Sequence, residues 1–105
     1  AVAIYDNYPV NKGHVLIIPK RHFANYFDST EEEIAAFYEL IKKVKTLLDK
    51  DFRPDGYNIG ININEAAGQT IFHLHIHLIP RYNGDVNNPR GGVRNLKKAL
   101  VEYNG

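Results

Sequence analysis

The sequence predicts one domain that combines four short β-strands with one long α-helix. Four segments are continuously apolar or alternate with polar residues, while one longer segment repeats apolar residues at three- and four-residue steps. A chain of 105 residues can bury one hydrophobic core but not two. We therefore expect a single domain over residues 1–105, with residues 82–105 as an irregular loop and C-terminal tail.

The composition excludes several classes of protein. Hydrophobic residues make up 44% and charged residues 24%, which is ordinary for a globular domain. A net charge of +1 gives no field for bulk nucleic acid or a membrane surface. No apolar run approaches the roughly 20 residues of a membrane helix, and we expect no secretory leader. The absence of cysteine excludes thiolate metal sites and is compatible with the cytoplasm, where we expect the protein.

The N-terminal part predicts two strands joined by a turn. Residues 2–5 lack turn formers and read as a strand, although the chain opens at Ala1 and we expect residues to be missing upstream. Residues 6–13 are rich in turn formers. Residues 14–19 form a nearly continuous apolar run, which predicts a strand buried on both faces and ended by its proline.

One long helix follows. Ser29 and Glu32 fit a capping box, in which each side chain satisfies a free backbone N–H of the first turn. The helix is expected to end near Lys50, before Pro54. Its apolar residues recur at helical steps and predict one buried face: Ile34, Phe37, Ile41, Val44 and Leu48.

Residues 57–64 alternate between two kinds of side chain. Tyrosine and isoleucines would form one face of a strand, and asparagines with a glycine the other. Because asparagine is depleted in strands, this second face predicts hydrogen bonding to a ligand, and Asn62 is a candidate contact. In an antiparallel pair with the next strand, the asparagine face would lie beside a row of histidines.

That row is His73, His75 and His77, which alternate with apolar residues up to Pro80. On a strand the three imidazoles would share one face. Burying them without a task would leave polar groups unsatisfied, at roughly 1–3 kcal/mol each. A single metal ion about 2 Å from each ligand is hard to reach, since the outer two histidines would lie roughly 13 Å apart.

Nucleophilic attack at phosphorus fits this row of histidines better than a purely structural role or a single metal site. Neutral imidazole is a good nucleophile near pH 7, and its neighbours can donate hydrogen bonds to phosphate oxygens. The preceding Gly68-Gln69-Thr70 offers backbone N–H, amide and hydroxyl groups for the same oxygens.

Residues 73–79 resemble the His-φ-His-φ-His-φ-φ signature of the histidine triad (HIT) superfamily, where φ is apolar. The flanking Gly68-Gln69-Thr70 and Pro80-Arg81 are similar to its fragile-histidine-triad branch, and residues 89–94 to prokaryotic members. The resemblance covers residue 1 to about residue 94.

The resemblance implies an α+β fold, in which an antiparallel sheet is packed by one long and one short helix and continues across a homodimer. Residues 96–103 would supply the short helix. It also implies a nucleotide hydrolase or transferase that forms a nucleotidyl-histidine intermediate. His75 would be the nucleophile, flanked by His77 and His73, with Gln69 on the phosphate and leaving-group oxygens. The implied substrate-binding residues are Asp6, His14, Asn62, Thr70 and Arg81.

The flanking residues favour dinucleoside polyphosphates as substrates. A nucleoside phosphoramidase, a phosphorylase that uses phosphate in place of water, a metal-dependent hydrolase and a nucleotide-binding module without turnover remain alternatives. Three of these residues have a structural alternative that the sequence leaves open: Asp6 as the start of a turn, His14 as a structural residue of its strand, and Arg81 as a strand end in solvent. We expect no cofactor and no metal ligands on the protein, beyond a metal ion that accompanies the polyphosphate. The cysteines of the family's zinc site are absent, and His22 and His73 would be its only remnants.

Overall fold

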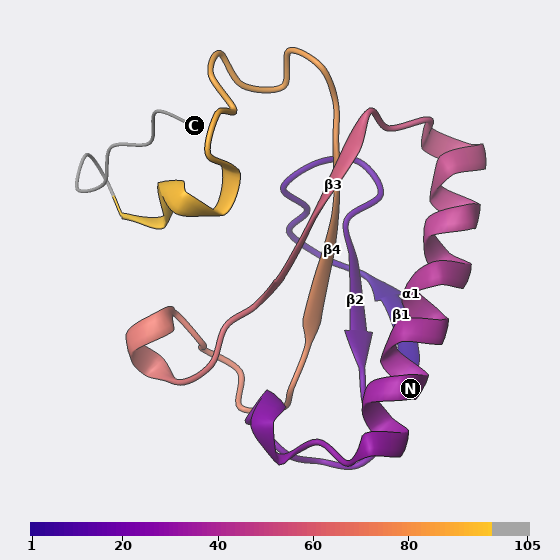
Figure 1. Ribbon diagram of the computed structural model, residues 1–105, viewed down its shortest axis with the longest axis vertical. Helices are drawn as coiled ribbons and strands as arrows, with labels where there is room; N and C mark the ends of the chain where they lie inside the picture. The colour runs from indigo at the N-terminus through magenta and orange to yellow at the C-terminus, as the bar shows by residue number, and fades with distance from the viewer. Residues whose placement is uncertain (98–105) are drawn as a thin grey trace.

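The computed structural model describes residues 1–97 and contains a four-stranded antiparallel sheet with one long helix against it (Figure 1). The strand order is β1-β2-β4-β3, so neighbouring strands of the sheet are distant in sequence. The elements are β1 (Val2–Tyr5), β2 (Val15–Ile18), α1 (Glu31–Phe52), β3 (Gly56–Ile61) and β4 (Ile76–Arg81). Three short 3-10 helices lie in the connections and the C-terminal part: Tyr26–Asp28, Glu65–Ala67 and Gly92–Leu96. The predicted α+β class is confirmed.

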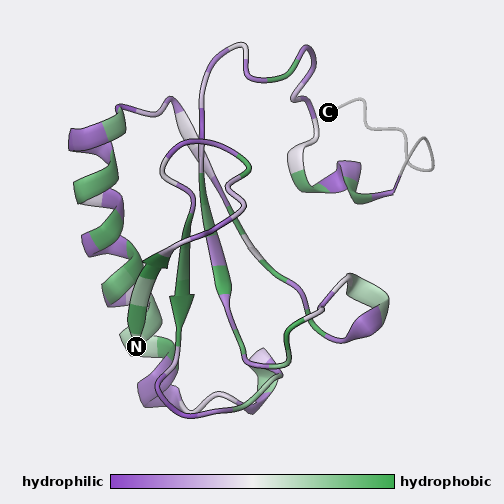
Figure 2. Ribbon diagram, turned by 180° about the vertical axis from the view of Figure 1, so that it is seen from behind, coloured by the Kyte–Doolittle hydropathy of each residue, from purple (hydrophilic) through white to green (hydrophobic). Residues whose placement is uncertain are grey.

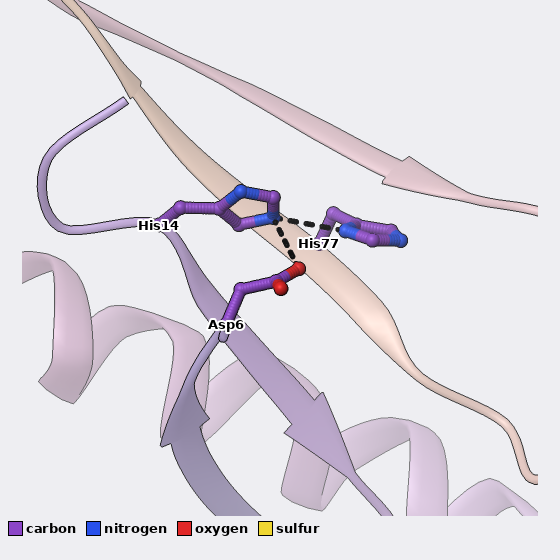
Figure 3. A group of neighbouring side chains, drawn as sticks. All are labelled: Asp6, His14 and His77. Atoms are coloured by element: carbon purple, nitrogen blue, oxygen red, sulfur yellow. Dashed lines mark hydrogen bonds and ion pairs between the residues drawn. The ribbon is translucent and has the colours of Figure 1, made fainter. Parts of the chain in front are cut away.

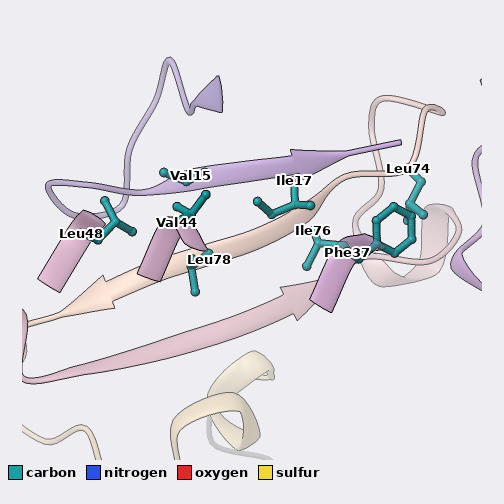
Figure 4. Close-up of a cluster of buried hydrophobic side chains, with 8 residues drawn as sticks. All are labelled: Val15, Ile17, Phe37, Val44, Leu48, Leu74, Ile76 and Leu78. Carbon is teal, nitrogen blue, oxygen red and sulfur yellow. The ribbon is translucent and has the colours of Figure 1, made fainter. Parts of the chain in front are cut away.

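The core lies between α1 and one face of the sheet (Figure 4). The helix contributes its predicted apolar face, and the two central strands contribute every second residue. Each fully buried aliphatic or aromatic side chain contributes about 1.5–3 kcal/mol to folding. The buried cluster consists of Val15, Ile17, Phe37, Val44, Leu48, Leu74, Ile76 and Leu78.

The opposite face of the sheet is only partly covered. Figure 2 shows β2 as hydrophobic along its length, yet Leu16 and Ile18 are half-buried while their neighbours on the strand are buried. The predicted burial of β2 on both faces is therefore complete on the helix side only. No helix within residues 1–97 is long and apolar enough to cross a membrane.

The register of β3 and β4 places the asparagine face beside the histidine face. The pairs Gly60↔His77 and Asn58↔Ile79 lie side by side in this antiparallel pair. Because facing residues in an antiparallel pair project from the same face of the sheet, Asn58 and His77 share the face turned away from α1. The predicted neighbourhood of the two faces is confirmed.

The three histidines do not lie on one strand, contrary to the prediction. Strand β4 begins at Ile76, so only His77 belongs to it, and His73 and His75 precede it. Pairing with β2 and β3 stops at Ile76, and the backbone N–H of Leu74 donates instead to the carbonyl of Phe23, at 2.7 Å. Alternating burial persists through this segment although the sheet hydrogen bonds do not.

The helix begins one residue later than the prediction. Thr30 is the N-cap: its Oγ1 accepts from the backbone N–H of Glu33 at 3.1 Å, and the Glu33 carboxylate accepts from the Thr30 N–H at 2.9 Å. Residues 29–33 read Ser-Thr-Glu-Glu-Glu, so two registers of the same motif fit the sequence. The buried Ser29 hydroxyl has no hydrogen-bond partner among residues 1–97.

The end of α1 and the segment after β4 each differ from the prediction in one detail. Helix α1 extends to Phe52 rather than Lys50, and Arg53 then takes a left-handed conformation before Pro54. The irregular segment after β4 contains a short 3-10 helix, Gly92–Leu96. The short final helix predicted over residues 96–103 falls almost entirely outside the described residues.

The cap assignment predicts opposite effects for two adjacent substitutions. Thr30→Ala should lower the free energy of unfolding by about 1 kcal/mol, because it removes the acceptor of the Glu33 N–H. Ser29→Ala, the matched control, should leave it unchanged or raise it, because it removes a buried hydroxyl without a partner. Urea unfolding measures both. A larger loss for Ser29→Ala would contradict the observed register.

Candidate active site

A pocket of about 630 Å³ opens on the sheet face turned away from α1. Its apolar part comes from Ile4 of β1 and from Leu16 and Ile18 of β2. Along each strand these residues alternate with residues that face the helix or the edge of the sheet. Its polar part combines histidines with residues of the loop after β3. Such a pocket has the size and mixed character of a small-molecule site. The polar side chains lining it are Asp6, Asn7, His14, Asn62, Thr70, His73, His75 and His77, with the hydroxyls of Tyr5 and Tyr8.

The main chain fixes which nitrogen of His14 carries a proton. The backbone N–H of Val10 donates to His14 Nδ1 at 3.0 Å. Since an N–H can only donate, Nδ1 is an acceptor and the proton of the neutral ring is on Nε2. His14 Nε2 lies 2.9 Å from His77 Nδ1, so His14 donates to His77 (Figure 3).

His77 is thereby left as a hydrogen-bond donor. Its Nδ1 accepts from His14, so its own proton is on Nε2. This Nε2 is buried and has no hydrogen-bond partner among residues 1–97. Leaving such a group unsatisfied costs about 1–3 kcal/mol, which favours an acceptor oxygen from a ligand at this position. Three consecutive donors thus run from Val10 through His14 to the pocket.

His75 has the opposite polarity. Its Nδ1 lies 2.9 Å from the carbonyl oxygen of His73, which can only accept, so the proton of the neutral ring is on Nδ1. Its Nε2 therefore carries a free lone pair and makes no hydrogen bond within the described chain. The rings of His75 and His77 pack edge to face, with centroids 5.1 Å apart. A nucleophilic nitrogen thus lies beside a hydrogen-bond donor.

Both ring nitrogens of His73 make hydrogen bonds to other parts of the chain. Its Nε2 donates to the carbonyl oxygen of Pro19 at 3.0 Å, so its Nδ1 accepts from His22 Nδ1, also at 3.0 Å. His73 lines the pocket but has no free nitrogen, whereas His22 does not line it. The three histidines of the motif therefore have three different roles in the structure.

His14 and His77 form a histidine relay of hydrogen bonds, and burial keeps both rings neutral. Desolvation lowers the pKa of His14, against the opposing charge of Asp6, and lowers that of His77 together with the charges of His75 and His14. The unfolded chain would take up these protons near the ordinary value of 6.5, while the folded protein resists them. The stability from the neutral rings is complete above that value and is lost as the pH falls through the lowered pKa values.

Asp6 begins a turn and also lines the pocket. Its Oδ1 accepts from the Tyr8 backbone N–H at 2.8 Å, as expected for a residue that begins a turn. Its Oδ2 lies 3.4 Å from His14 Nε2, and the residue lines the pocket (Figure 3). Its carboxylate therefore faces the histidine relay, and contact with ribose hydroxyls stays a prediction.

Gly13 allows His14 to enter β2 at the right place. Its φ of +87° belongs to the left-handed region, and an added Cβ would lie 3.1 Å from side-chain atoms of both Phe52 and Pro80. A larger residue would be strained and crowded there. The buried His14 is thus held by the turn before it as well as by the strand after it.

Asn62 and Thr70 lie on the pocket wall. Neither side chain hydrogen-bonds another described residue, so the amide and the hydroxyl are available to a ligand. Gly68, between them in the chain, lines the same wall. Their roles in binding phosphate remain predictions.

Two other predicted residues lie away from the pocket lining. Gln69 is 3% exposed, and its side chain binds backbone groups of Asn64, Ala24 and Ile71. Arg81 makes a bidentate ion pair with Asp85, at 2.8 Å from both Nε and Nη2, which holds the pKa of that carboxyl well below its usual range. The structure does not bring these two side chains to the histidine relay.

One group of residues within 1–97 has the spacing of a metal site: Asp6, His14 and His77. A metal ion would need the lone pair of His14 Nε2. The Val10 N–H already holds the other lone pair of this ring at Nδ1, so the neutral ring keeps its proton on Nε2. These donors and acceptors suit a chain of hydrogen bonds better than a metal ion.

Sequence reasoning missed the main-chain groups that orient the rings. The Val10 N–H and the His73 and Pro19 carbonyls act without their side chains, so no residue type signals them. It also missed the apolar part of the pocket. Since β2 is apolar throughout, its composition does not reveal that Leu16 and Ile18 face a pocket.

Comparison with known proteins supports the histidine motif. The HIT domain model matches residues 1–84. An uncharacterized HIT-like protein of Methanocaldococcus jannaschii is 39% identical over 99% of this chain and 82% of its own length. The AP-4-A phosphorylase of Mycobacterium tuberculosis is 35% identical over 81% of this chain, and the asymmetrical bis(5'-nucleosyl)-tetraphosphatase of Schizosaccharomyces pombe 39% over 73%. The match spans only 44% and 42% of these two enzymes.

Solved structures with the same fold come from the same family. A hypothetical histidine triad nucleotide-binding protein from Sulfolobus tokodaii has a crystal structure that superposes with a TM-score of 0.74 and 44% identity, covering 78% of this chain and 55% of that one. The family model, the relatives and this fold agree on one assignment. The chain belongs to the HIT superfamily and is similar to its prokaryotic members.

Proposed function

We propose that this protein is a nucleotide hydrolase or nucleotidyltransferase in which His75 attacks the α-phosphorus of a dinucleoside polyphosphate. The observation that carries the proposal is the hydrogen bond from His75 Nδ1 to the His73 carbonyl, because it leaves the Nε2 lone pair free in the pocket. Neutral imidazole is a competent nucleophile at this centre.

In the first step the Nε2 lone pair of His75 forms a bond to phosphorus, and the P–O bond to the leaving polyphosphate breaks. The electron pair of that bond leaves with the oxygen. Charge on the phosphate oxygens is stabilised by donors that are already oriented, of which the His77 Nε2–H is one. In the second step an acceptor oxygen attacks phosphorus, and the N–P bond breaks with its electron pair returning to His75 Nε2. Where the acceptor is water, its proton leaves to solvent, and neutral His75 is restored.

The pocket supports a nucleotide as substrate. Its apolar part from Ile4, Leu16 and Ile18 suits a base, and the histidine end suits a phosphate. The relatives named as an AP-4-A phosphorylase and a bis(5'-nucleosyl)-tetraphosphatase favour dinucleoside polyphosphates. One of these names implies phosphate as the acceptor, so phosphorolysis is the second candidate reaction.

We further propose, on the resemblance alone, that the sheet continues across a homodimer, and, from the absence of cysteine, that the protein acts in the cytoplasm. Nucleotide release from diadenosine polyphosphates, adenosine phosphoramidates and nucleotidyl sugars, each with and without inorganic phosphate, tests the substrate class and the acceptor together. Turnover of phosphoramidates alone would replace the proposed substrate.

His75→Ala should lower turnover of the preferred substrate by several orders of magnitude, because no other ring that lines the pocket offers a free, oriented lone pair. His22→Ala is the matched control: it removes a histidine outside the pocket lining and should keep turnover of the same order. Mass spectrometry of rapidly quenched protein should detect a nucleotidyl adduct that is absent from His75→Ala. Unchanged turnover by His75→Ala would remove the nucleophile assignment.

The hydrogen bonds of the site predict which nitrogen of each ring carries the proton at pH 7. Long-range ¹H–¹⁵N NMR should find the proton on Nε2 of His14 and His77, and on Nδ1 of His75. Because Asp6 raises the pKa of His14 and His77, Asp6→Asn should shift their titrations to lower pH. Asp51→Asn, an exposed carboxylate on α1, should leave them unchanged. A shift to higher pH in Asp6→Asn would refute the electrostatic role of this carboxylate.

The donor arrangement at His14 also predicts that the protein needs no resident metal ion. Protein stripped by a chelator, then freed of it and assayed with Mg²⁺ supplied alongside the substrate, should keep full turnover. Elemental analysis checks the stripping. If stripping abolished turnover and zinc alone restored it, the metal-dependent alternative would be correct.

A further inference from the structure

The loop between β3 and β4 forms one wall of the pocket and has an unusual backbone. Asn64, at its start, has a φ of +71°, and Gly68, on the pocket wall, has a φ of +91°. A positive φ at a residue other than glycine is uncommon and costs free energy unless the surroundings fix it. The position of Gly68 and Thr70 in the pocket therefore depends on whatever holds Asn64.

The buried Gln69 holds this loop closed. Its Oε1 accepts from the Asn64 backbone N–H at 2.9 Å, and its own backbone N–H donates to the Asn64 carbonyl at 3.2 Å. These two bonds tie the end of the loop to its start, at the residue with the positive φ. With 3% exposure, the amide makes these bonds away from competing water.

The same amide fastens the loop to another part of the chain. Its Nε2 donates to the carbonyl of Ala24 at 3.0 Å, in the connection between β2 and α1, and to that of Ile71 at 3.2 Å. The Leu74 N–H donates to Phe23 in the same connection. The segment that leads to His75 is thus attached at both of its ends.

We propose that Gln69 is a positioning residue for nucleotidyl transfer: it places Gly68 and Thr70 against the phosphate and sets the segment whose His73 carbonyl orients His75. This inference rests on the proposed function for its chemistry, but its structural part does not. It also gives Gln69 a role through the backbone, in place of the direct contact with phosphate that the sequence predicted.

A glutamine suits this position because one acceptor and two donors are needed within one buried side chain. Glutamate keeps the acceptor for Asn64 but would place a charge against the carbonyls of Ala24 and Ile71. Methionine keeps the approximate volume and makes none of the bonds. Gln69→Glu and Gln69→Met therefore separate the loss of the donors from the loss of the whole network.

Both variants should lower kcat for the preferred substrate by about 10²-fold, the effect of misplacing reacting groups by about 1 Å. KM should change much less, because the apolar part of the pocket is unchanged. Val44→Ala is the stability control: this buried α1 residue lies on the far side of the sheet, and its loss destabilises the fold without touching the pocket. It should keep the kcat of the folded protein.

Amide hydrogen exchange, which does not depend on turnover, separates the proposed role of Gln69 from the proposed function. In wild-type protein the hydrogen-bonded amides of Asn64, Ala67, Gly68 and Gln69 should exchange slowly with solvent, and they should exchange faster in both Gln69 variants but not in Val44→Ala. Wild-type protein that turns over no nucleotide substrate would overturn the proposed function alone. Variants with wild-type exchange and a wild-type His75 tautomer, or with undiminished kcat, would overturn the role of Gln69. If Gln69→Met fails to fold, Gln69→Glu carries the comparison.

Discussion

The polarity of the His14–His77 pair depends on one main-chain hydrogen bond, from the Val10 N–H to His14. A backbone N–H cannot exchange roles with its acceptor, so it sets the direction of the bond between the two rings. His14 must donate to His77, and His77 must present a donor to the pocket. The turn that holds Val10, with Gly13 packed against Phe52 and Pro80, is therefore as important to the site as the histidines themselves.

The fold supplies two different supports for this cluster. The packed face of the sheet, with α1 against it, fixes β2 and β4 and hence the separation of His14 and His77. The segment before β4 is held by another means, because it has no sheet partner. There His73 and Gln69 bind backbone carbonyls of Pro19 and Ala24. His75 thus lies on hydrogen-bonded loop structure, and His77 beside it lies on a strand.

Much of this architecture could be predicted from the sequence because it depends on local patterns. The helix repeat around Phe37 and Val44, and the alternation around His77, each report which face is buried. The cap was misplaced by one residue because residues 29–33 satisfy the same motif in two registers. The histidine strand was predicted too long because alternation of burial persists where sheet pairing has ended, and pairing depends on a partner strand.

The sequence by itself determined the classes of element, the row of alternating histidines and the asparagine face beside it. The tertiary structure decided what each of these side chains does. His14 and His77 are 63 residues apart, and Gln69 and Ala24 are 45 apart, so their bonds exist only in the folded chain. The three imidazoles of the motif differ because different groups bind them: main-chain carbonyls set the protons of His73 and His75, and the His14 side chain sets that of His77. The positions of the protons on His73 and His77 are set by such distant partners, which residue type and spacing do not encode.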